Sequence, residues 1–241
     1  DIFVHRGDLM GAEHNEKVIV KMTEWREGDK NPTGKVIRVL GKAGVHEVEI
    51  HSIMAEFGLP FEYPQEADQE ANAIPEKITS KEIKARRDFR DVTTFTIDPA
   101  DAKDYDDAIS YRKLENGNLE VGVHIADVTH YVKPKTALEK EAYDRATSVY
   151  LVDRTIPMLP ERLSNGLCSL RPHEDKLTFA CVFEMDSNAN VLNHWIGRTI
   201  IHSDRRFAYE EAQENIDNQS GDFFQELTLL NDLAKQVRKR R

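Results

Sequence analysis

The sequence predicts an α+β fold in which a small antiparallel β-barrel precedes a larger domain of mixed α and β structure. The first observation is that short apolar segments alternate with polar turns near the N-terminus, at Val18 to Trp25, Lys35 to Gly41 and Val45 to Ile53, as the strands of a small barrel do. The second is that helix-capping patterns and strand-like runs follow one another after residue 78. With 241 residues, the chain is long enough for one large or two modest domains with a buried core.

The composition indicates in which compartment the protein is found and which partners it can bind. No apolar run is long enough to cross a bilayer and none has the form of a secretory signal, so we expect a cytoplasmic protein with no membrane partner. Cys168 and Cys181 lack the paired spacing of a metal site and are expected to be buried thiols. The formal net charge of −10 disfavours nonspecific binding of nucleic acid, although a loop that holds cations would offset part of that charge.

The segment between the two predicted domains ends in a helix. Residues 59–78 contain Pro60, Pro64 and Pro75 among many acids, which predicts a linker with one helical turn. Thr79-Ser-Lys-Glu82 has the form of a capping box, so a helix is expected from there to about Arg90. Residues 93–97 are β-branched or aromatic and predict a strand that leads into an acidic loop.

Local signals also place the elements that follow the loop. Asn116-Gly117 lies between two strand-like runs and predicts a hairpin, and Thr136-Ala-Leu-Glu139 predicts a second capped helix. The expected elements are strands at 107–114 and 119–125, a helix from Thr136 to about Ala146, extended chain at 147–152 and 156–160, a hairpin of 176–186 and 191–202, and helices at 208–216 and from the capping residue Asp222 to about Val237. The last helix carries an apolar stripe at Phe223, Leu227, Leu230 and Ala234, spaced for burial.

The acidic loop is the most informative stretch of the sequence. It contains five aspartates, which are Asp98, Asp101, Asp104, Asp106 and Asp107. Pro99 removes a backbone donor and keeps Asp98 extended. Carboxylates this close repel one another, and all of them can be ionised together only if cations lie between them. Hard oxygen ligands of this kind suit Mg²⁺ or Mn²⁺.

Two other types of acidic loop fit these residues less well. A solvated acidic turn is the ordinary explanation of an Asp-rich run, but the apolar strand before this loop and the apolar Ala108-Ile109 after it predict that it is held against a core. A calcium-binding loop shares the Asp-x-Asp spacing of Asp104 and Asp106. It lacks the glycine and the closing glutamate that such a loop requires.

Five motifs in a fixed order resemble one enzyme family. They are Asp98-x5-Asp104-x-Asp106-Asp107, His124-Ile-Ala-Asp-Val128, Thr147-Ser-Val-Tyr150, Ile156-Pro-Met-Leu-Pro160 and Leu163-Ser-Asn-Gly-Leu-Cys-Ser-Leu170. Together they closely resemble the catalytic (RNB) domain of the ribonuclease II/ribonuclease R family of processive 3′-to-5′ exoribonucleases, nearest the bacterial ribonuclease R branch.

The resemblance implies a domain organisation. The N-terminal Asp1-Ile-Phe-Val-His and Gly11-Ala-x4-Lys17-Val resemble the later part of a cold-shock-like oligonucleotide-binding (OB) barrel, a fold that binds single strands by stacking and by a basic groove. We therefore expect a partial barrel at residues 1–58, a linker and helix at 59–90, and the first half of a mixed α/β RNB catalytic domain at 91–241. The chain opens on Asp1 and is expected to be a fragment that lacks a catalytic glutamate and an arginine of the family's later half.

The resemblance also implies roles for individual residues. Asp98, Asp104 and Asp107 are expected to bind two Mg²⁺ ions, and Asp106 to hold the terminal nucleotide or complete the metal shell. Asp101 falls at a position that the family pattern leaves open and is expected to be solvated. Two tyrosines, Tyr150 and Tyr209, match residues that stack on or clamp RNA. His124 lies mid-strand between apolar residues and is expected to be a structural histidine rather than an acid or base.

The expected function is therefore Mg²⁺-dependent removal of nucleoside 5′-monophosphates from the 3′ ends of single-stranded RNA. The alternative is an RNA-binding protein whose RNB-like domain no longer cleaves. The complete aspartate set argues against that alternative, because four carboxylates would repel phosphate unless a metal were bound.

Overall fold

The computed structural model describes residues 1–240 and divides into two compact units. The first unit comprises Asp1–Tyr63 together with Val149–Ile156. The second comprises Pro64–Ser148 and the chain from Pro157 onward. None of the helices in residues 1–240 is both long enough and apolar enough to cross a membrane.

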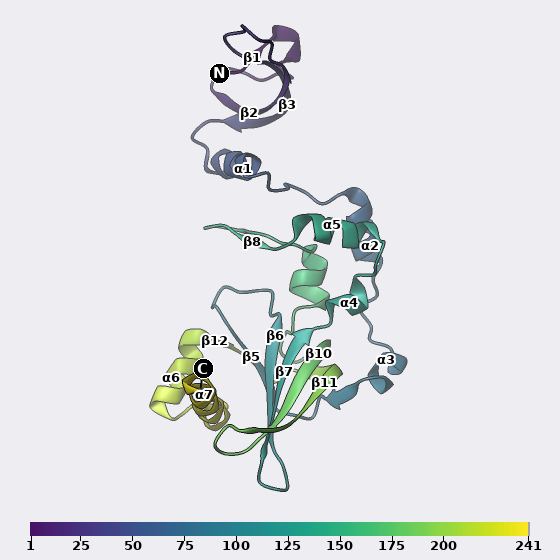
Figure 1. Cartoon of the computed structure of the whole chain (residues 1–241), viewed down its shortest axis with the longest axis vertical. Coiled ribbons are helices and arrows are strands. Elements are labelled where there is room, and N and C mark those ends of the chain that lie inside the picture. The colour runs from purple at the N-terminus through teal and green to yellow at the C-terminus, as the bar shows by residue number, and fades with distance from the viewer. Residues whose placement is uncertain (241) are drawn as a thin grey trace. The chain divides into compact units, whose positions relative to one another are not determined.

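A three-stranded sheet forms the body of the first unit (Figure 1). Its strands are β1 (Phe3–Val4), β2 (Glu16–Glu24) and β3 (Thr33–Lys42), in the order β1-β3-β2, with a short 3₁₀ turn, η1 (Arg6–Asp8), after β1. Strands β2 and β3 are antiparallel, while β1 pairs with β3 in parallel. The strands predicted near 18–25 and 35–41 are thus confirmed.

The strand predicted over Val45 to Ile53 is wrong, because this stretch is the helix α1 (His46–Glu56). Alternation of apolar and polar residues over so few positions fits a strand and a helix equally. The helix is favoured by acids in its first turn and by burial of Val48 and Met54 on one side. A hairpin of β8 (Val149–Tyr150) and β9 (Thr155–Ile156) is fixed to α1 by Arg154, which donates to both carboxylate oxygens of Glu47 at 2.7 and 2.8 Å.

The second unit is built on a seven-stranded sheet with the order β12-β5-β6-β7-β10-β11-β4 (Figure 1). The strands are β4 (Arg87–Phe89), β5 (Thr94–Asp98), β6 (Asp107–Lys113), β7 (Leu119–Ala126), β10 (Asp175–Met185), β11 (Val191–His202) and β12 (Arg205–Ala208). The four inner pairings from β5 to β11 are antiparallel, and the two outermost strands pair in parallel with their neighbours. The strand predicted at 93–97 and both predicted hairpins are confirmed.

One face of this sheet packs on helices from the first part of the unit. These are α2 (Gln65–Ala73), α4 (Val128–Tyr131), α5 (Ala137–Arg145) and the π-helix η2 (Arg162–Leu167). Leu163, Leu170 and Leu138 are buried in the core between them. The predicted linker is therefore wrong over α2, because Ala67 and Ala71, one helical turn apart, are fully buried and allow the helix to approach its neighbours closely. The cap predicted for α5 is confirmed, since Thr136 Oγ1 accepts from the Glu139 N–H at 3.1 Å.

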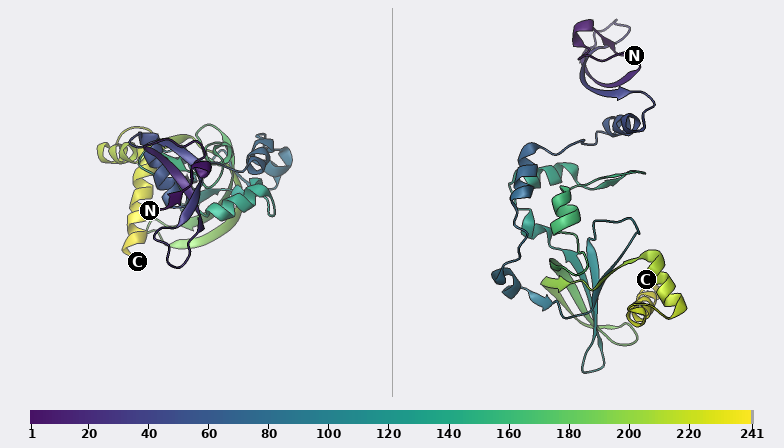
Figure 2. Two further views of the ribbon diagram at one scale, coloured as in Figure 1. Left: turned by 90° about the horizontal axis from the view of Figure 1, so that it is seen from above. Right: turned by 180° about the vertical axis from the view of Figure 1, so that it is seen from behind.

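Helices α6 (Tyr209–Asn218) and α7 (Phe224–Lys239) cover part of the other face. Both views in Figures 1 and 2 show them on the side of β12 and β5. Leu227 and Leu233 are the buried residues of α7, so Leu233 replaces the predicted Ala234 in the apolar stripe. Asp222 is not the cap of α7, because the N-cap position is Phe223; the Asp222 carboxylate instead accepts from Arg205 at 2.8 Å.

The helix predicted from Thr79 is shorter than expected. Thr79 caps it, accepting from the Glu82 N–H at 3.2 Å, but α3 spans only Ser80–Lys84. The helix ends before Arg86, whose side chain is buried and whose guanidinium binds Asp127 at 2.7 Å. Strand β4 begins at the next residue. Both side chains of that ion pair are almost fully buried, and removal of either partner would leave a charge without compensation.

Candidate functional site

Two neighbouring strands bring the predicted aspartates together. Strand β5 ends at Asp98, and β6 begins at Asp107. The strands are antiparallel, with Phe95 opposite Ile109, so the end of one and the start of the other lie at the same edge of the sheet. The loop between them carries Asp104 and Asp106. The four aspartates therefore lie at one end of a strand pair in which β5 is mostly buried and β6 buries Ala108 and Ser110.

The electrostatics of the loop show that these carboxylates lie close to one another. Burial raises the pKa of Asp98, and the charges of Asp107 and Asp104 raise it further, while the Thr96 side chain and the charge of Arg206 partly offset them. Partial desolvation raises the pKa of Asp106, followed by the charges of Asp104, Asp107 and Asp98. Removal from water and like-charge repulsion both favour the protonated form. The charge of a bound cation would favour the ionised form and so lower both pKa values.

The donor set fits a hard divalent cation. Asp98 is 8% exposed, and its Oδ2 is buried without a hydrogen-bond partner in residues 1–240. A buried carboxylate oxygen without a donor costs about 1–3 kcal/mol, and a cation would satisfy it. Within the same residues, no group of three or more His, Cys, Asp or Glu is already arranged to hold a metal together. The ligands are thus gathered in one loop, but their side chains are not arranged around a common point.

The predicted RNA-contacting tyrosines are both at the surface. Tyr209 is 55% exposed and is the first residue of α6. It directly follows Ala208, which pairs with Asp98 across β12 and β5, so Tyr209 starts at the same sheet edge as the acidic loop. Tyr150 is 65% exposed on β8 and belongs to the first unit. Neither tyrosine is a core residue.

His124 has the structural role that its position in the strand predicts. Its ring is fully buried, with Nε2 2.9 Å from Ser110 Oγ and Nδ1 3.1 Å from Thr199 Oγ1. Burial lowers the pKa of His124 to about 4, with a smaller contribution from the charge of Arg87. Both ring nitrogens are engaged inside the sheet, and the histidine is neutral at ordinary pH.

Sequence reasoning missed two residues that contact the acidic loop. Arg206 on β12 donates to carbonyl oxygens at the start of the loop, and the Ser169 hydroxyl binds backbone groups in its middle. Ser169 lies within the motif Leu163 to Leu170, and Arg206 lies three residues before Tyr209. Only the first of these stretches is one of the five motifs, and nothing local indicated what either residue contacts.

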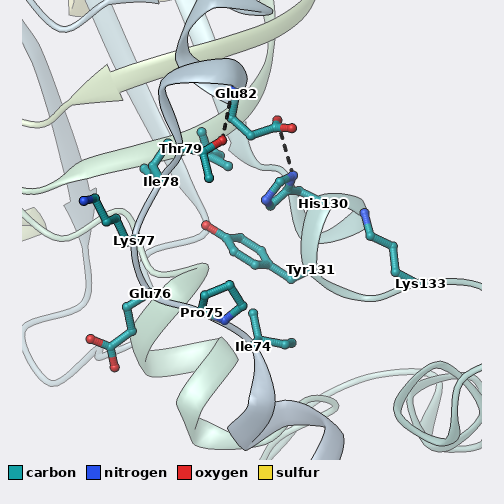
Figure 3. A pocket seen from close by; sticks show the side chains of 11 residues that line it. Ile74, Pro75, Glu76, Lys77, Ile78, Thr79, Glu82, His130, Tyr131 and Lys133 are labelled. Atoms are coloured by element: carbon teal, nitrogen blue, oxygen red, sulfur yellow. Dashed lines mark hydrogen bonds and ion pairs between the residues drawn. The ribbon is translucent and has the colours of Figure 1, made fainter.

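A separate pocket of about 310 Å³ lies between the segment that precedes α3 and helix α4 (Figure 3). Glu82, His130 and Tyr131 face it, with Glu82 Oε2 3.5 Å from His130 Nδ1. Its lining includes none of the four aspartates. Burial raises the pKa of Tyr131 to about 12, so its phenol stays protonated.

Comparisons with family models agree with this geometry. The model of the RNB domain matches residues 86–241, and the model of a cold shock domain matches residues 1–64. The α+β fold, with a cold-shock-like barrel ahead of an RNB-type domain, is thus confirmed.

The chain is similar to ribonucleases from bacteria and eukaryotes. It is 44% identical to ribonuclease R of Thermotoga maritima over 91% of this chain and 31% of the relative. It is 40% identical to the exosome complex exonuclease RRP44 of Homo sapiens over 93% of this chain and 24% of that protein. The chain spans about a third or less of the length of these curated relatives.

Solved structures show the same fold. RNase R of Mycoplasma genitalium, in complex with double-stranded RNA, superposes with a TM-score of 0.91 at 27% identity, covering 99% of this chain and 43% of that one. Yeast Ssd1, a pseudonuclease, superposes with a TM-score of 0.77 at 22% identity, covering 94% of this chain and 28% of that one, which is a likeness of fold alone. From the match over residues 86–241 and the shared architecture, we conclude that the chain belongs to the RNB domain family and is similar to its ribonuclease R members.

Proposed function

We propose that the protein containing this chain is a processive 3′-to-5′ exoribonuclease that releases nucleoside 5′-monophosphates from the ends of single-stranded RNA. Mg²⁺ is the proposed cofactor, in a two-ion site, with Mn²⁺ as the alternative ion. The observation that carries the proposal is the aspartate group at the end of β5 and the start of β6. Burial and the charges of Asp104 and Asp107 raise the pKa of Asp98 and of Asp106, and within residues 1–240 the buried Asp98 Oδ2 lacks a hydrogen-bond partner, so a cation would stabilise the ionised group.

Different residues of the chain would bind the metal ions, position the terminal nucleotide and stack on the RNA bases. Asp98, Asp104 and Asp107 would hold the ions, and Asp106 would position the terminal nucleotide or complete the metal shell. Divalent ions bound there would activate water and stabilise charge on the scissile phosphate. Exposed Tyr209 and Tyr150 offer flat rings on which bases can stack without regard to sequence.

A solved relative supports the substrate class, and the two cysteines bear on the proposed compartment. One solved RNase R is in complex with ribose-methylated single-stranded RNA, which is a statement about that enzyme and supports RNA as the ligand here. Cys168 and Cys181 are both free thiols, which is consistent with a reducing compartment such as the cytoplasm.

The experiment compares Asp106→Asn with Asp101→Asn in the full-length protein. The substrate is single-stranded RNA with a 3′ tail, and released 5′-monophosphate is measured with Mg²⁺ and with EDTA. Asp106→Asn should reduce the rate by about a hundredfold or more, because it removes a charge at the reacting centre. Asp101 lies in the same loop and is exposed, so its substitution should leave the rate within about twofold of wild type.

The rival function is RNA binding without cleavage, and the likeness to a pseudonuclease shows that the fold itself does not decide between the two. The same assay separates them. A full-length protein that binds the RNA tightly but releases no nucleotide with Mg²⁺ or Mn²⁺ would replace the nuclease proposal with the binding one.

A further inference from the structure

The acidic loop has little internal structure of its own. Between Asp98 and Asp107, a single backbone hydrogen bond within the loop is present in residues 1–240, from the Ala102 N–H to the Pro99 carbonyl at 3.1 Å. A loop with so few internal bonds is expected to sample many conformations unless other parts of the protein hold it. Contacts with residues outside the loop must therefore hold its conformation.

Arg206 holds the first half of the loop. It lies on β12 opposite Thr96 of β5, which directs it towards the chain that leaves β5. Its Nη2 donates to the carbonyl oxygens of Pro99 at 2.5 Å and Ala100 at 2.8 Å. The same guanidinium lies over the ring of Tyr105, 5.5 Å from the ring centroid, a distance at which a cation is attracted to an aromatic face. One side chain thus connects the start of the loop to Tyr105, between Asp104 and Asp106.

Ser169 holds the second half. Its side chain is fully buried, and its Oγ accepts from the Tyr105 N–H at 3.0 Å and donates to the Lys103 carbonyl at 2.9 Å. The next residue, Leu170, donates its N–H to the Tyr105 carbonyl at 2.8 Å. The backbone on both sides of Tyr105 is therefore fixed, and with it the peptides that carry Asp104 and Asp106.

The acceptors that Arg206 bonds decide whether the carboxylate oxygens of the loop stay available to a metal. A guanidinium close to several carboxylates ordinarily forms a two-pronged pair with one of them, which would occupy oxygens that a metal needs. Here Nη2 of Arg206 bonds two carbonyl oxygens instead. The arginine lowers the repulsion around Asp98 by its charge while it holds the backbone rather than a carboxylate.

We propose that Arg206 and Ser169 are positioning residues, which together clamp the loop of residues 99–106 in the conformation that lets the four aspartates share divalent cations. This inference rests on the proposed metal-dependent function. A loop released from the clamp spends only part of its time in the competent conformation, and its apparent metal affinity falls by that fraction. The clamp thus acts on metal binding before any RNA is present.

The test measures binding of Mn²⁺ to the full-length protein without RNA, by calorimetry and by electron paramagnetic resonance. Ser169→Ala removes both hydroxyl bonds, and Arg206→Gln removes the guanidinium. Each should weaken Mn²⁺ binding by about tenfold, and the RNA-shortening rate should recover at high Mg²⁺. Arg206→Lys should rescue little, because an ammonium lacks the planar fork that reaches two carbonyls and a ring at once.

Matched controls separate positioning from general loss of stability. Arg205 is the neighbour of Arg206, but it binds Asp222 and Glu211 rather than the loop. Ser164 lies in the same motif as Ser169, and its Oγ bonds only weakly, at 3.5 Å, to Pro160 and Asn165. Arg205→Gln should lower the melting temperature and Ser164→Ala should change it little, and neither should change Mn²⁺ affinity.

The outcomes are distinct. Wild-type Mn²⁺ affinity in Ser169→Ala, Arg206→Gln and Arg206→Lys, in a protein whose Mn²⁺ binding is lost on Asp104→Asn, would overturn the clamp and leave the proposed function standing. Absence of Mn²⁺ binding in the wild type, or binding that does not depend on Asp104, would overturn both. Equal weakening in the clamp variants and in both controls would also overturn the clamp, since it would reflect stability alone.

Discussion

At the scale of single residues, His124 shows how burial within the sheet keeps a titratable side chain neutral. Its two ring nitrogens lie within hydrogen-bond distance of Ser110 and Thr199, and no water reaches it, because it is fully buried. Burial lowers its pKa to about 4 from an ordinary value of 6.5. The folded protein therefore takes up this proton only in distinctly acidic solution.

This shift predicts a loss of stability in acid. Above pH 6.5 the histidine is neutral in both the folded and unfolded states and has no effect. As the pH falls from 6.5 towards 4, the unfolded state binds the proton first, so stability falls by up to about 3 kcal/mol. Urea unfolding between pH 4 and 8 should show this loss in the wild type and less of it in His124→Asn. A slope that His202→Gln removes and His124→Asn does not would contradict the assignment.

Tyr209 yields a second prediction at the residue scale. Its side chain is 55% exposed, so Tyr209→Ala should leave the fold intact and weaken binding of single-stranded RNA by about 1–3 kcal/mol through lost stacking. The measurement is fluorescence anisotropy in an Asp106→Asn background, which prevents cleavage. Tyr143 on α5 is 80% exposed and serves as the control. The same loss from Tyr143→Ala would show that Tyr209 has no special role.

At the scale of elements, α2 and α5 are joined through a helix terminus. Glu70 of α2 accepts from the backbone N–H groups of Ala137 and Leu138, at 3.2 and 2.8 Å, while Thr136 supplies the ordinary cap. The first N–H groups of a helix have no intrahelical acceptor, and a carboxylate there also meets the positive end of the helix dipole. One side chain thereby fixes the packing of two helices.

Glu70→Ala should accordingly lower the free energy of unfolding by about 1–2 kcal/mol. Gln69→Ala, an exposed position on the same helix, should change it by less than about 0.5 kcal/mol. Chemical denaturation of both variants at neutral pH measures the difference. Equal effects would mean that the Glu70 carboxylate does not support α5.

Elements whose signals are local could be predicted from the sequence. The Thr79 and Thr136 caps each depend on a partner three residues away, and the Asn116-Gly117 turn depends on its own two residues. Helix α1 could not be predicted, because alternation over the nine residues from Val45 to Ile53 fits a strand and a helix equally until tertiary packing decides. Helix α2 could not either, because its burial depends on contacts with α5 and η2, which lie far along the chain.

The candidate site also contains residues that the sequence predicts and residues that it does not. Its aspartates are predictable because they share one loop. The residues that hold the loop come from far along the chain, since Ser169 lies 64 positions after Tyr105 and Arg206 lies 107 after Pro99. Only the pairing of β12 with β5 and the packing of η2 bring them to the loop. No spacing rule within the sequence expresses either contact.

At the scale of the whole molecule, one hydrophobic core of the second unit is shared by several segments that lie far apart in the chain. Leu163 of η2 is fully buried there, with residues from α2, β4 and α5. Leu163→Ala should therefore lower the stability of this unit by about 2–5 kcal/mol, through lost burial and the cavity left behind. Val152→Ala in the first unit, at a side chain that is wholly exposed, is the control. Denaturant unfolding followed by circular dichroism tests both, and a Leu163→Ala protein as stable as the control would contradict the core assignment.

The seven-stranded sheet is bounded by its two shortest members. Strand β4 has three residues and β12 has four, which is less than the five or six of an ordinary strand. Both carry arginines, and both pair in parallel with the strand beside them. A foreign chain that paired with either edge would meet few backbone groups in line with its own, so the short outer strands protect the sheet against edge-to-edge aggregation.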